Sequence, residues 1–145
     1  MKKQFILLTS LFLFLGLHVI NAQATQQECT IKYNLFKGDY QSKKYDDAFP
    51  NWIYLMDNCP TLSINIYKLG DKLTEARFKK ATNKTEALVL VKRVYKQRLE
   101  YFPSKDPAKV HSDYATFLVK NKLATDDEVF EILELAYSID PTRMG

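Results

Sequence analysis

Apolar residues recur at every third or fourth position along most of the chain, which is the spacing of one face of an α-helix. Between about residues 61 and 81 the apolar side is formed by Leu62, Ile66, Leu69, Leu73 and Ala76. The opposite side of this stretch is polar and rich in lysine, as expected of a helix between a core and solvent. The same pattern predicts six helices, at about 28–42, 46–58, 61–81, 84–102, 107–122 and after residue 125.

Residues that start or stop helices divide this pattern into pairs. Thr125 and Glu128 have the spacing of a capping box, which marks the start of the last helix. Pro60, Pro103 and Pro141 each follow the second helix of a pair, where the helix has to end because proline cannot continue it. We therefore expect three antiparallel hairpins with a period near ~34 residues, which indicates an internal repeat.

Pro50 interrupts the second predicted helix near its beginning. Proline has no amide proton, but the first amides of a helix have no intrahelical acceptor to lose. If Asp46 or Asp47 caps the helix, Pro50 lies in the first turn. The proline is then expected to mark the start of a helix rather than a break in it.

The first 24 residues have the composition of a secretory signal peptide. Lys2 and Lys3 precede an apolar run from 5 to 20, and Ala22 and Ala24 are small residues suited to cleavage by signal peptidase. The run is shorter than the ~20 residues of a membrane span, and no basic flank follows it. We therefore expect residues 1–24 to be removed on export, with an uncleaved N-terminal anchor as the alternative.

Charge and composition narrow the class of the remaining domain, residues 25–145. The whole chain has 21 Lys and Arg against 17 Asp and Glu. Loss of the leader removes two lysines and no acidic residue, so 19 basic and 17 acidic residues remain, a net charge of +2. No global basic field therefore points to nucleic acid, and stable membrane insertion after cleavage is not expected. Four glycines and five prolines are few for a β-sandwich, so we expect an all-α domain.

Cys29 and Cys59 are the two cysteines of the chain. In an antiparallel helix pair the start of the first helix lies beside the end of the second, so both are expected at the same end of the first hairpin. Export to an oxidising compartment permits a bond between them. We therefore predict a structural disulfide. Two free thiols or a redox-active pair are the alternatives, although redox pairs usually share a Cys-x-x-Cys unit.

Other residues with catalytic or metal-binding chemistry are sparse. His111 is the histidine that remains after the leader, and one histidine with two bonded cysteines cannot form an ordinary zinc site. The sequence has no glycine-rich phosphate loop and no Gly-x-Ser-x-Gly motif. The acids of 125–128 fit a helix start, and the basic stretch 92–98 fits the solvated face of a helix. We expect no enzymatic activity, no metal and no cofactor.

Three stretches resemble tetratricopeptide repeats in the spacing of their small and bulky residues: 43–60, 63–73 and 133–141. The matching residues are Tyr45, Ala48, Trp52 and Pro60 in the first, Leu69 and Gly70 in the second, and Ala136 and Pro141 in the third. The small residues lie where helices of that family cross closely. The stretches YDDAFPNW, NCP and NIYKLG are also similar to an N-terminal region of exported repeat proteins of Bacteroidota. The resemblance implies a right-handed stack of three hairpins, an α-solenoid, with repeats at about 29–60, 61–103 and 107–141, in a domain that continues in a longer protein.

The resemblance also implies a binding groove lined by the fifth and ninth residues of each repeat. With Cys29, Ser63 and Val110 as first positions, the fifth residue is tyrosine each time, and the ninth residues are Lys37, Asp71 and Leu118. Tyrosine offers a stiff contact area and a hydroxyl for a peptide backbone. The candidate groove residues are Tyr33, Lys37, Tyr40, Tyr67, Asp71, His111 and Tyr114. The alternative is that these tyrosine rings pack between helices and bind nothing.

The expected function is that of an exported, non-enzymatic scaffold that binds a peptide or protein on the concave face of its repeats. Its expected location is the periplasm or outer envelope of a Gram-negative bacterium, or outside the cell. The alternatives are a structural spacer or N-terminal cap of a larger envelope protein and, with less support, a hydrolase of cell-wall sugars, which needs two facing carboxylates. The last hairpin has an apolar set with no later helix to cover it, which predicts self-association or a longer chain at this end: Phe130, Leu135, Tyr137 and Ile139.

Overall fold

The computed structural model describes residues 24–144, so the predicted leader lies outside the described residues except for Ala24. The described residues form six α-helices and a short 3₁₀ helix, with no strand among them. They are α2 (Gln26–Gln41), α3 (Tyr45–Asn58), α4 (Asn65–Lys80), α5 (Lys84–Tyr101), α6 (Pro107–Asn121) and α7 (Asp126–Ile139), followed by η1 (Pro141–Arg143). The predicted all-α class and the six helices are confirmed.

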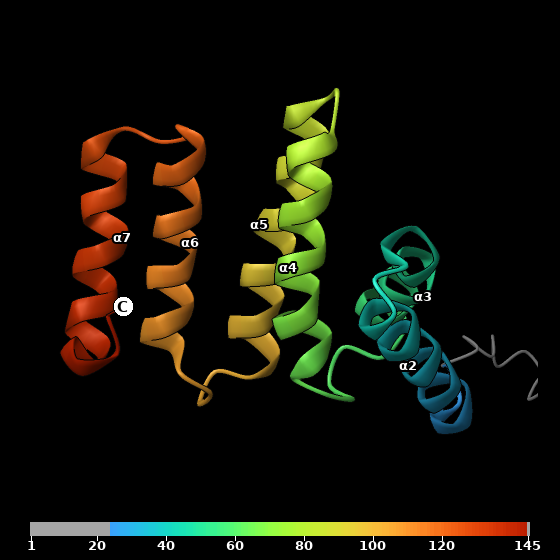
Figure 1. Ribbon diagram of the computed structural model, residues 1–145. Helices are drawn as coiled ribbons and strands as arrows, with labels where there is room; N and C mark the ends of the chain where they lie inside the picture. The colour runs from blue at the N-terminus through green and yellow to red at the C-terminus, as the bar shows by residue number, and fades with distance from the viewer. Residues whose placement is uncertain (1–23, 145) are drawn as a thin grey trace, which may run out of the picture.

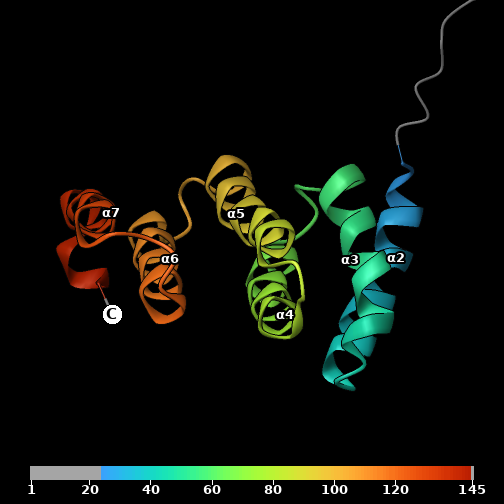
Figure 2. The ribbon, with the colours of Figure 1, turned by 90° about the horizontal axis from the view of Figure 1, so that it is seen from above.

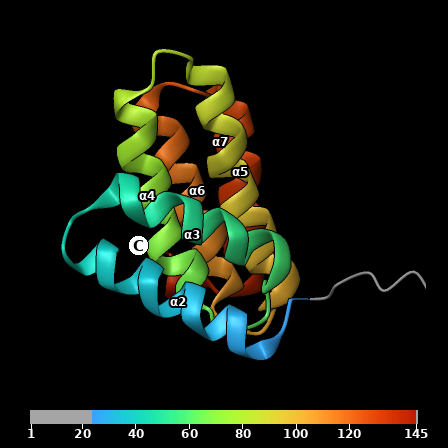
Figure 3. The ribbon, with the colours of Figure 1, turned by 90° about the vertical axis from the view of Figure 1, so that its right-hand side faces the viewer.

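Consecutive helices pack as pairs, α2 with α3, α4 with α5 and α6 with α7, and each pair contacts the next along the chain. Figure 1 shows α4 to α7 standing side by side, with the first pair beyond them at the N-terminal end. From above, α6 and α7 are seen nearly end-on whereas α2 and α3 are seen from the side (Figure 2). The first pair therefore lies across the direction of the last, and Figure 3 shows the same crossing from the end of the molecule.

The first core lies between the first helix pair and α4. Trp52 is fully buried there, and its indole Nε1 donates a hydrogen bond to the Ile66 carbonyl at 2.9 Å. The other buried members are Cys29, Phe36, Ala48, Leu55, Met56, Cys59, Tyr67, Leu73 and Val94. Gly70 faces the tryptophan ring so closely that an added Cβ would lie 2.8 Å from the ring atom Cε2. The absence of a side chain at this position therefore lets α4 approach α3.

A second core joins the middle helix pair to α6. Its buried members are Phe78, Val91, Tyr95, Val110, Phe117 and Leu118. Phe78 on α4 and Phe117 on α6 meet edge to face, with ring centroids 5.2 Å apart. Helix α4 thus contacts both its partner α5 and the next-but-one helix α6.

Two predicted helix starts have different outcomes. At α7 the Thr125 hydroxyl accepts a hydrogen bond from the Glu128 amide, and the Glu128 carboxylate accepts one from the Thr125 amide at 2.8 Å. The predicted capping box is therefore confirmed. Helix α4 starts at Asn65, later than the predicted residue 61, because the chain first turns, with the Leu62 amide bonded to the Cys59 carbonyl at 3.1 Å.

Pro50 lies further inside α3 than the sequence predicts. The Ala48 amide already donates to the Lys44 carbonyl at 2.9 Å, so the helix begins before either candidate aspartate cap. The prediction that Pro50 occupies the first turn is therefore wrong. In the second turn, proline leaves the carbonyl of Asp46 without the amide four residues on. Asp46 is an exposed residue, so water can reach this end of the helix.

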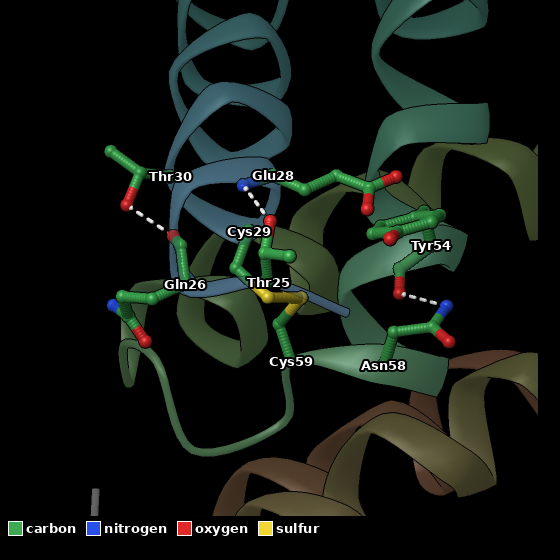
Figure 4. The surroundings of a disulfide bond; sticks show 8 residues. All are labelled: Thr25, Gln26, Glu28, Cys29, Thr30, Tyr54, Asn58 and Cys59. Carbon is green, nitrogen blue, oxygen red and sulfur yellow. Dashed lines mark hydrogen bonds between the residues drawn. A yellow bond between two sulfur atoms is a disulfide. The ribbon is translucent and has the colours of Figure 1, made fainter. Parts of the chain in front are cut away.

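The first turn of α2 is joined to the end of α3 by Cys29 and Cys59, whose sulfur atoms lie at disulfide distance (Figure 4). Their Cα atoms are 5.9 Å apart, and both residues are buried. Beside them the Thr25 hydroxyl caps α2 by accepting a hydrogen bond from the Glu28 amide at 3.1 Å. The helix pair thus brings the two cysteines together at one end, as predicted.

Candidate binding groove

Tyr67 is a core residue, so its predicted place in an open groove is wrong for this structure. Its side chain is fully buried in the first core. Its hydroxyl donates a hydrogen bond to the Pro60 carbonyl at 2.9 Å, and its ring meets Phe102 edge to face. Burial raises the pKa of the hydroxyl well above its usual value. A partner cannot reach this ring without opening the core.

The other two fifth-position tyrosines also connect helices. The Tyr33 hydroxyl on α2 accepts hydrogen bonds from Ser63 at 3.3 Å and Asn65 at 3.2 Å, at the start of α4. Tyr114 on α6 packs against Tyr95 on α5, with ring centroids 4.9 Å apart. Both rings are half-buried. The alternative stated above, that these rings pack between helices, therefore describes their contacts.

The remaining predicted groove residues are dispersed. Lys37 is exposed on α2, and Tyr40 packs against two aromatic neighbours at the end of that helix. His111 is half-buried on α6, where burial lowers its pKa, and Leu118 belongs to the second core. Of the predicted residues, Asp71 faces an open groove.

That groove lies between α4 and α6, has a volume of about 640 Å³, and is closed below by α5. We call it the α4–α6 groove. Its charged and aromatic lining residues are Lys68, Asp71, Lys72 and Glu75 on α4, Tyr95 and Arg98 on α5, and Lys109, Asp113, Phe117 and Lys120 on α6. The groove therefore combines a polar floor with a rim of lysines.

Asp71 and Tyr95 form a polar pair on the floor. The tyrosine hydroxyl donates a hydrogen bond to the Asp71 carboxylate at 2.7 Å. Burial raises the pKa of Asp71, although the bond from Tyr95 and the positive charge of Arg98 oppose this rise. Burial and the adjacent carboxylate raise the pKa of Tyr95, so its proton stays on the hydroxyl. Asp71 keeps lone pairs that can accept further hydrogen bonds from the groove.

Arg98 lies beside this pair and is almost entirely buried, with 6% of its surface exposed. Its Nε has no hydrogen-bond partner among the described residues. None of the ion pairs found in this part of the chain includes Arg98. Buried arginines are ordinarily paired or hydrogen-bonded because burying an unpaired charge is unfavourable. Arg98 is therefore a buried cation that lines the groove, and its unpaired Nε is itself enclosed by protein.

The acids of the rim already have partners. Glu75 lies 3.0 Å from Lys79 and 3.3 Å from Lys120, and Asp113 lies 2.7 Å from Lys109. Burial would raise the pKa of Glu75, but its two lysine partners lower it overall. The rim carboxylates are thus neutralised by neighbouring lysines.

The prediction that the basic stretch 92–98 lies on the solvated face of its helix is wrong for Arg98, which is 6% exposed. Arg98 follows Val91 by seven residues and Tyr95 by three, so it belongs to the buried stripe of α5. A charged residue in an apolar stripe marks a position where burial conflicts with charge. Fifth and ninth positions fall on the first helix of each pair, whereas this residue comes from the second.

A smaller hollow of about 370 Å³ lies where α3, α4 and α5 meet. Its arginine, Arg77, is bonded to Asp46 at 3.0 Å and lies over the ring of Phe49, 3.8 Å from its centroid. The arginine of this hollow already has an ion-pair partner, whereas Arg98 in the α4–α6 groove has none among the ion pairs found.

The predicted apolar set at the last helix is exposed: Phe130 at 65%, Leu135 at 48%, Tyr137 at 62% and Ile139 at 43%. Within residues 24–144, no three or more His, Cys, Asp or Glu residues gather where a metal could bind, and no helix has the length and apolarity to cross a membrane. Comparison with protein-family models, with curated proteins and with solved structures finds no match for this chain.

Proposed function

We propose that this protein is an exported, non-enzymatic scaffold that binds an extended peptide or protein segment in the α4–α6 groove. The observation that carries the proposal is Arg98, a buried cation whose Nε has no hydrogen-bond partner among the described residues, at the base of an open groove. An extended peptide presents carbonyl and amide groups in alternation. The small exposed part of Arg98, 6% of its surface, can donate to a carbonyl even though its Nε is itself enclosed, and Asp71 can accept from the amides.

The walls of the groove suit an extended peptide whose side chains project to both sides of its main chain. Leu69 on α4 supplies half-buried apolar surface at the groove, and exposed lysines surround its opening. Peptide sites in proteins commonly combine such apolar walls with a few oriented polar groups. The groove is lined from three helices and is not an enclosed cavity, which favours a segment of chain over a small enclosed ligand.

The proposal includes a tetratricopeptide-like solenoid and the periplasm or outer envelope as its setting. Three hairpins packed in sequence order support the solenoid, and so does the close approach of Trp52 to Gly70, one of the matching small residues. The cysteine pair supports an oxidising compartment. The alternative within the same class is a structural spacer or N-terminal cap of a larger envelope protein, for which the exposed apolar set of α7 would be the attachment surface.

A hydrolase remains the rival class because two acids, Asp71 and Asp113, line the same groove from opposite helices. Burial raises the pKa of Asp71, as a general acid requires. However, Asp71 accepts a hydrogen bond from Tyr95, and Asp113 is paired with Lys109. The groove therefore offers hydrogen bonds for a ligand more readily than a free acid and base.

A selection from a random peptide library tests the proposal. The protein is expressed with its own leader, purified from the periplasm of a bacterial host, and used to enrich peptides. Their affinities are then measured by calorimetry for wild type, Arg98→Gln and Lys96→Gln. Lys96 is exposed on α5 and does not line the groove.

Losing a buried donor should weaken binding by at least about tenfold in Arg98→Gln, with Lys96→Gln close to wild type. Thermal unfolding of both variants establishes that they fold. Failure to enrich any peptide, or equal affinities for the two variants, would contradict the assignment of the groove.

A further inference from the structure

We infer that the segment held in the α4–α6 groove is acidic, with its carboxylates lying between Lys68 and Lys72 on the rim and its main chain over Arg98. This inference rests on the proposed function and adds the chemistry of the partner. It follows from basic side chains that take part in no ion pair among residues 24–144.

The groove has more positive than negative charge. Five of its lining residues are basic, and three are acidic, namely Asp71, Glu75 and Asp113. Glu75 and Asp113 are engaged by Lys120 and Lys109, so these two pairs cancel. The remaining lining charges are two lysines and one arginine against the single carboxylate of Asp71.

Lys68 and Lys72 stand one helical turn apart on α4, so their like charges share one face. Both are exposed, and the side chain of neither takes part in a hydrogen bond or ion pair found between residues 24 and 144. Like charges at this spacing repel each other weakly. A carboxylate placed between them would replace this repulsion by two attractions.

The charge of the domain is distributed unevenly along the chain. From 65 to 101, covering α4, α5 and their turn, the chain has ten Lys or Arg against four Asp or Glu, a net charge of +6. Helix α7 carries five acids and no Lys or Arg. The near balance of residues 25–145 therefore conceals a basic middle, whose field attracts an acidic segment.

The floor of the groove favours a peptide over a nucleic acid. Single-stranded nucleic acids bind to exposed aromatic rings on which bases stack. Stacking needs a whole exposed ring face, which Tyr95 at 6% and Phe117 at 5% exposure do not offer. A single hydrogen bond needs one exposed atom only, and Arg98, also 6% exposed, is asked for no more than that. The Asp71 carboxylate on the floor would repel a phosphate but accepts a hydrogen bond from a peptide amide.

The test uses fluorescence anisotropy with a short labelled peptide of alternating glutamate and serine, acetylated and amidated so that only side-chain carboxylates are charged. The neutral control replaces each glutamate with glutamine. The protein variants are Lys68→Gln/Lys72→Gln and the matched pair Lys92→Gln/Lys96→Gln. The matched pair has the same spacing, exposure and charge change on α5 but does not line the groove.

We expect the glutamate peptide to bind at least about tenfold more tightly than the glutamine peptide. Added salt should reduce this difference in affinity, because it screens the charges. The Lys68/Lys72 variant should lose about tenfold in affinity and the Lys92/Lys96 variant less than about twofold. Equal losses in both variants would overturn the inference, because they would indicate only a general field. A single-stranded oligonucleotide that binds more tightly than the peptide, and loses affinity in the Lys68/Lys72 variant, would also overturn it.

The library selection separates this inference from the proposed function. Acidic peptides that depend on Arg98 support both. Neutral peptides that depend on Arg98 leave the groove as a binding site and overturn only its acidic specificity. Peptides that are indifferent to Arg98→Gln overturn both.

Discussion

Gly70→Ala should destabilise the protein although alanine is the better helix former. Gly70 lies in the middle of α4, facing the Trp52 ring on α3. A new Cβ would clash with Nε1 and lie 2.8 Å from Cε2. The ring cannot simply move away, because it is fully buried and its Nε1 is bonded to the Ile66 carbonyl at 2.9 Å.

The magnitude follows from three effects of different sign. Overpacking a filled core costs about 1–3 kcal/mol. If the ring shifts, the indole donor loses its acceptor, and an unsatisfied buried donor costs about 1–3 kcal/mol more. Alanine returns about 1 kcal/mol through helix propensity. We expect a net loss of about 2–4 kcal/mol in the free energy of unfolding, since the two unfavourable effects exceed the propensity gain.

Urea unfolding followed by tryptophan fluorescence measures this loss directly, because Trp52 is the one tryptophan of the chain. Gly38→Ala is the matched control: it lies in α2 with no atom within 4 Å of an added Cβ. This control should gain up to about 1 kcal/mol from propensity. The double variant Gly70→Ala/Trp52→Phe, followed by circular dichroism, should lose less than the sum of its single changes. A Gly70→Ala protein as stable as Gly38→Ala would refute the packing argument.

Three further changes test other parts of the structure. Replacing Cys29 and Cys59 by serine should lower the free energy of unfolding by about 3–4 kcal/mol, from loop entropy; mass spectrometry after alkylation without reductant should find neither thiol modified in wild type. Burial raises the folded-state pKa of Asp71, so its carboxylate destabilises the fold above that pKa and the penalty fades as pH falls through it. Asp71→Asn should therefore gain most stability at neutral pH and progressively less in acid, measured by urea unfolding across pH. Arg98→Met should leave the free energy of unfolding unchanged or raise it by about 1–3 kcal/mol, because a buried unpaired charge becomes an apolar side chain; a loss of more than about 2 kcal/mol in urea unfolding would mean that Arg98 supports the core.

The sequence predicts the helices well because each helix carries its own periodicity and capping signals. The Thr125 capping box is a local pattern, and the structure reproduces it. The start of α3 is misplaced because local rules favour an aspartate cap, whereas the helix begins before Asp46 and tolerates Pro50 in its second turn. Tertiary packing of Ala48 and Trp52 into the first core outweighs the hydrogen bond that the proline cannot make.

The groove is harder to predict because its residues come from three helices. Repeat spacing selects Tyr67 as a groove residue, but it cannot show that the turn before α4 folds the ring into the core. Asp71 is found by the same spacing and does line the groove. Arg98 is missed because it lies on the second helix of its pair, where spacing rules for the concave face do not apply. Three-dimensional packing decides which of these side chains remain accessible.

At position 98, folding favours an apolar residue, whereas the proposed binding function favours arginine. The buried stripe that contains it is otherwise filled by Val91, Val94 and Tyr95, so an apolar residue would satisfy the fold at position 98. A buried cation without an ion pair raises the free energy of the folded state, and such strain is typically found where a ligand supplies the missing contact. The two rim lysines add solvated positive charges that take part in no ion pair among residues 24–144. The proposed acidic peptide would contact both, with its main chain at Arg98 and its carboxylates at the rim lysines.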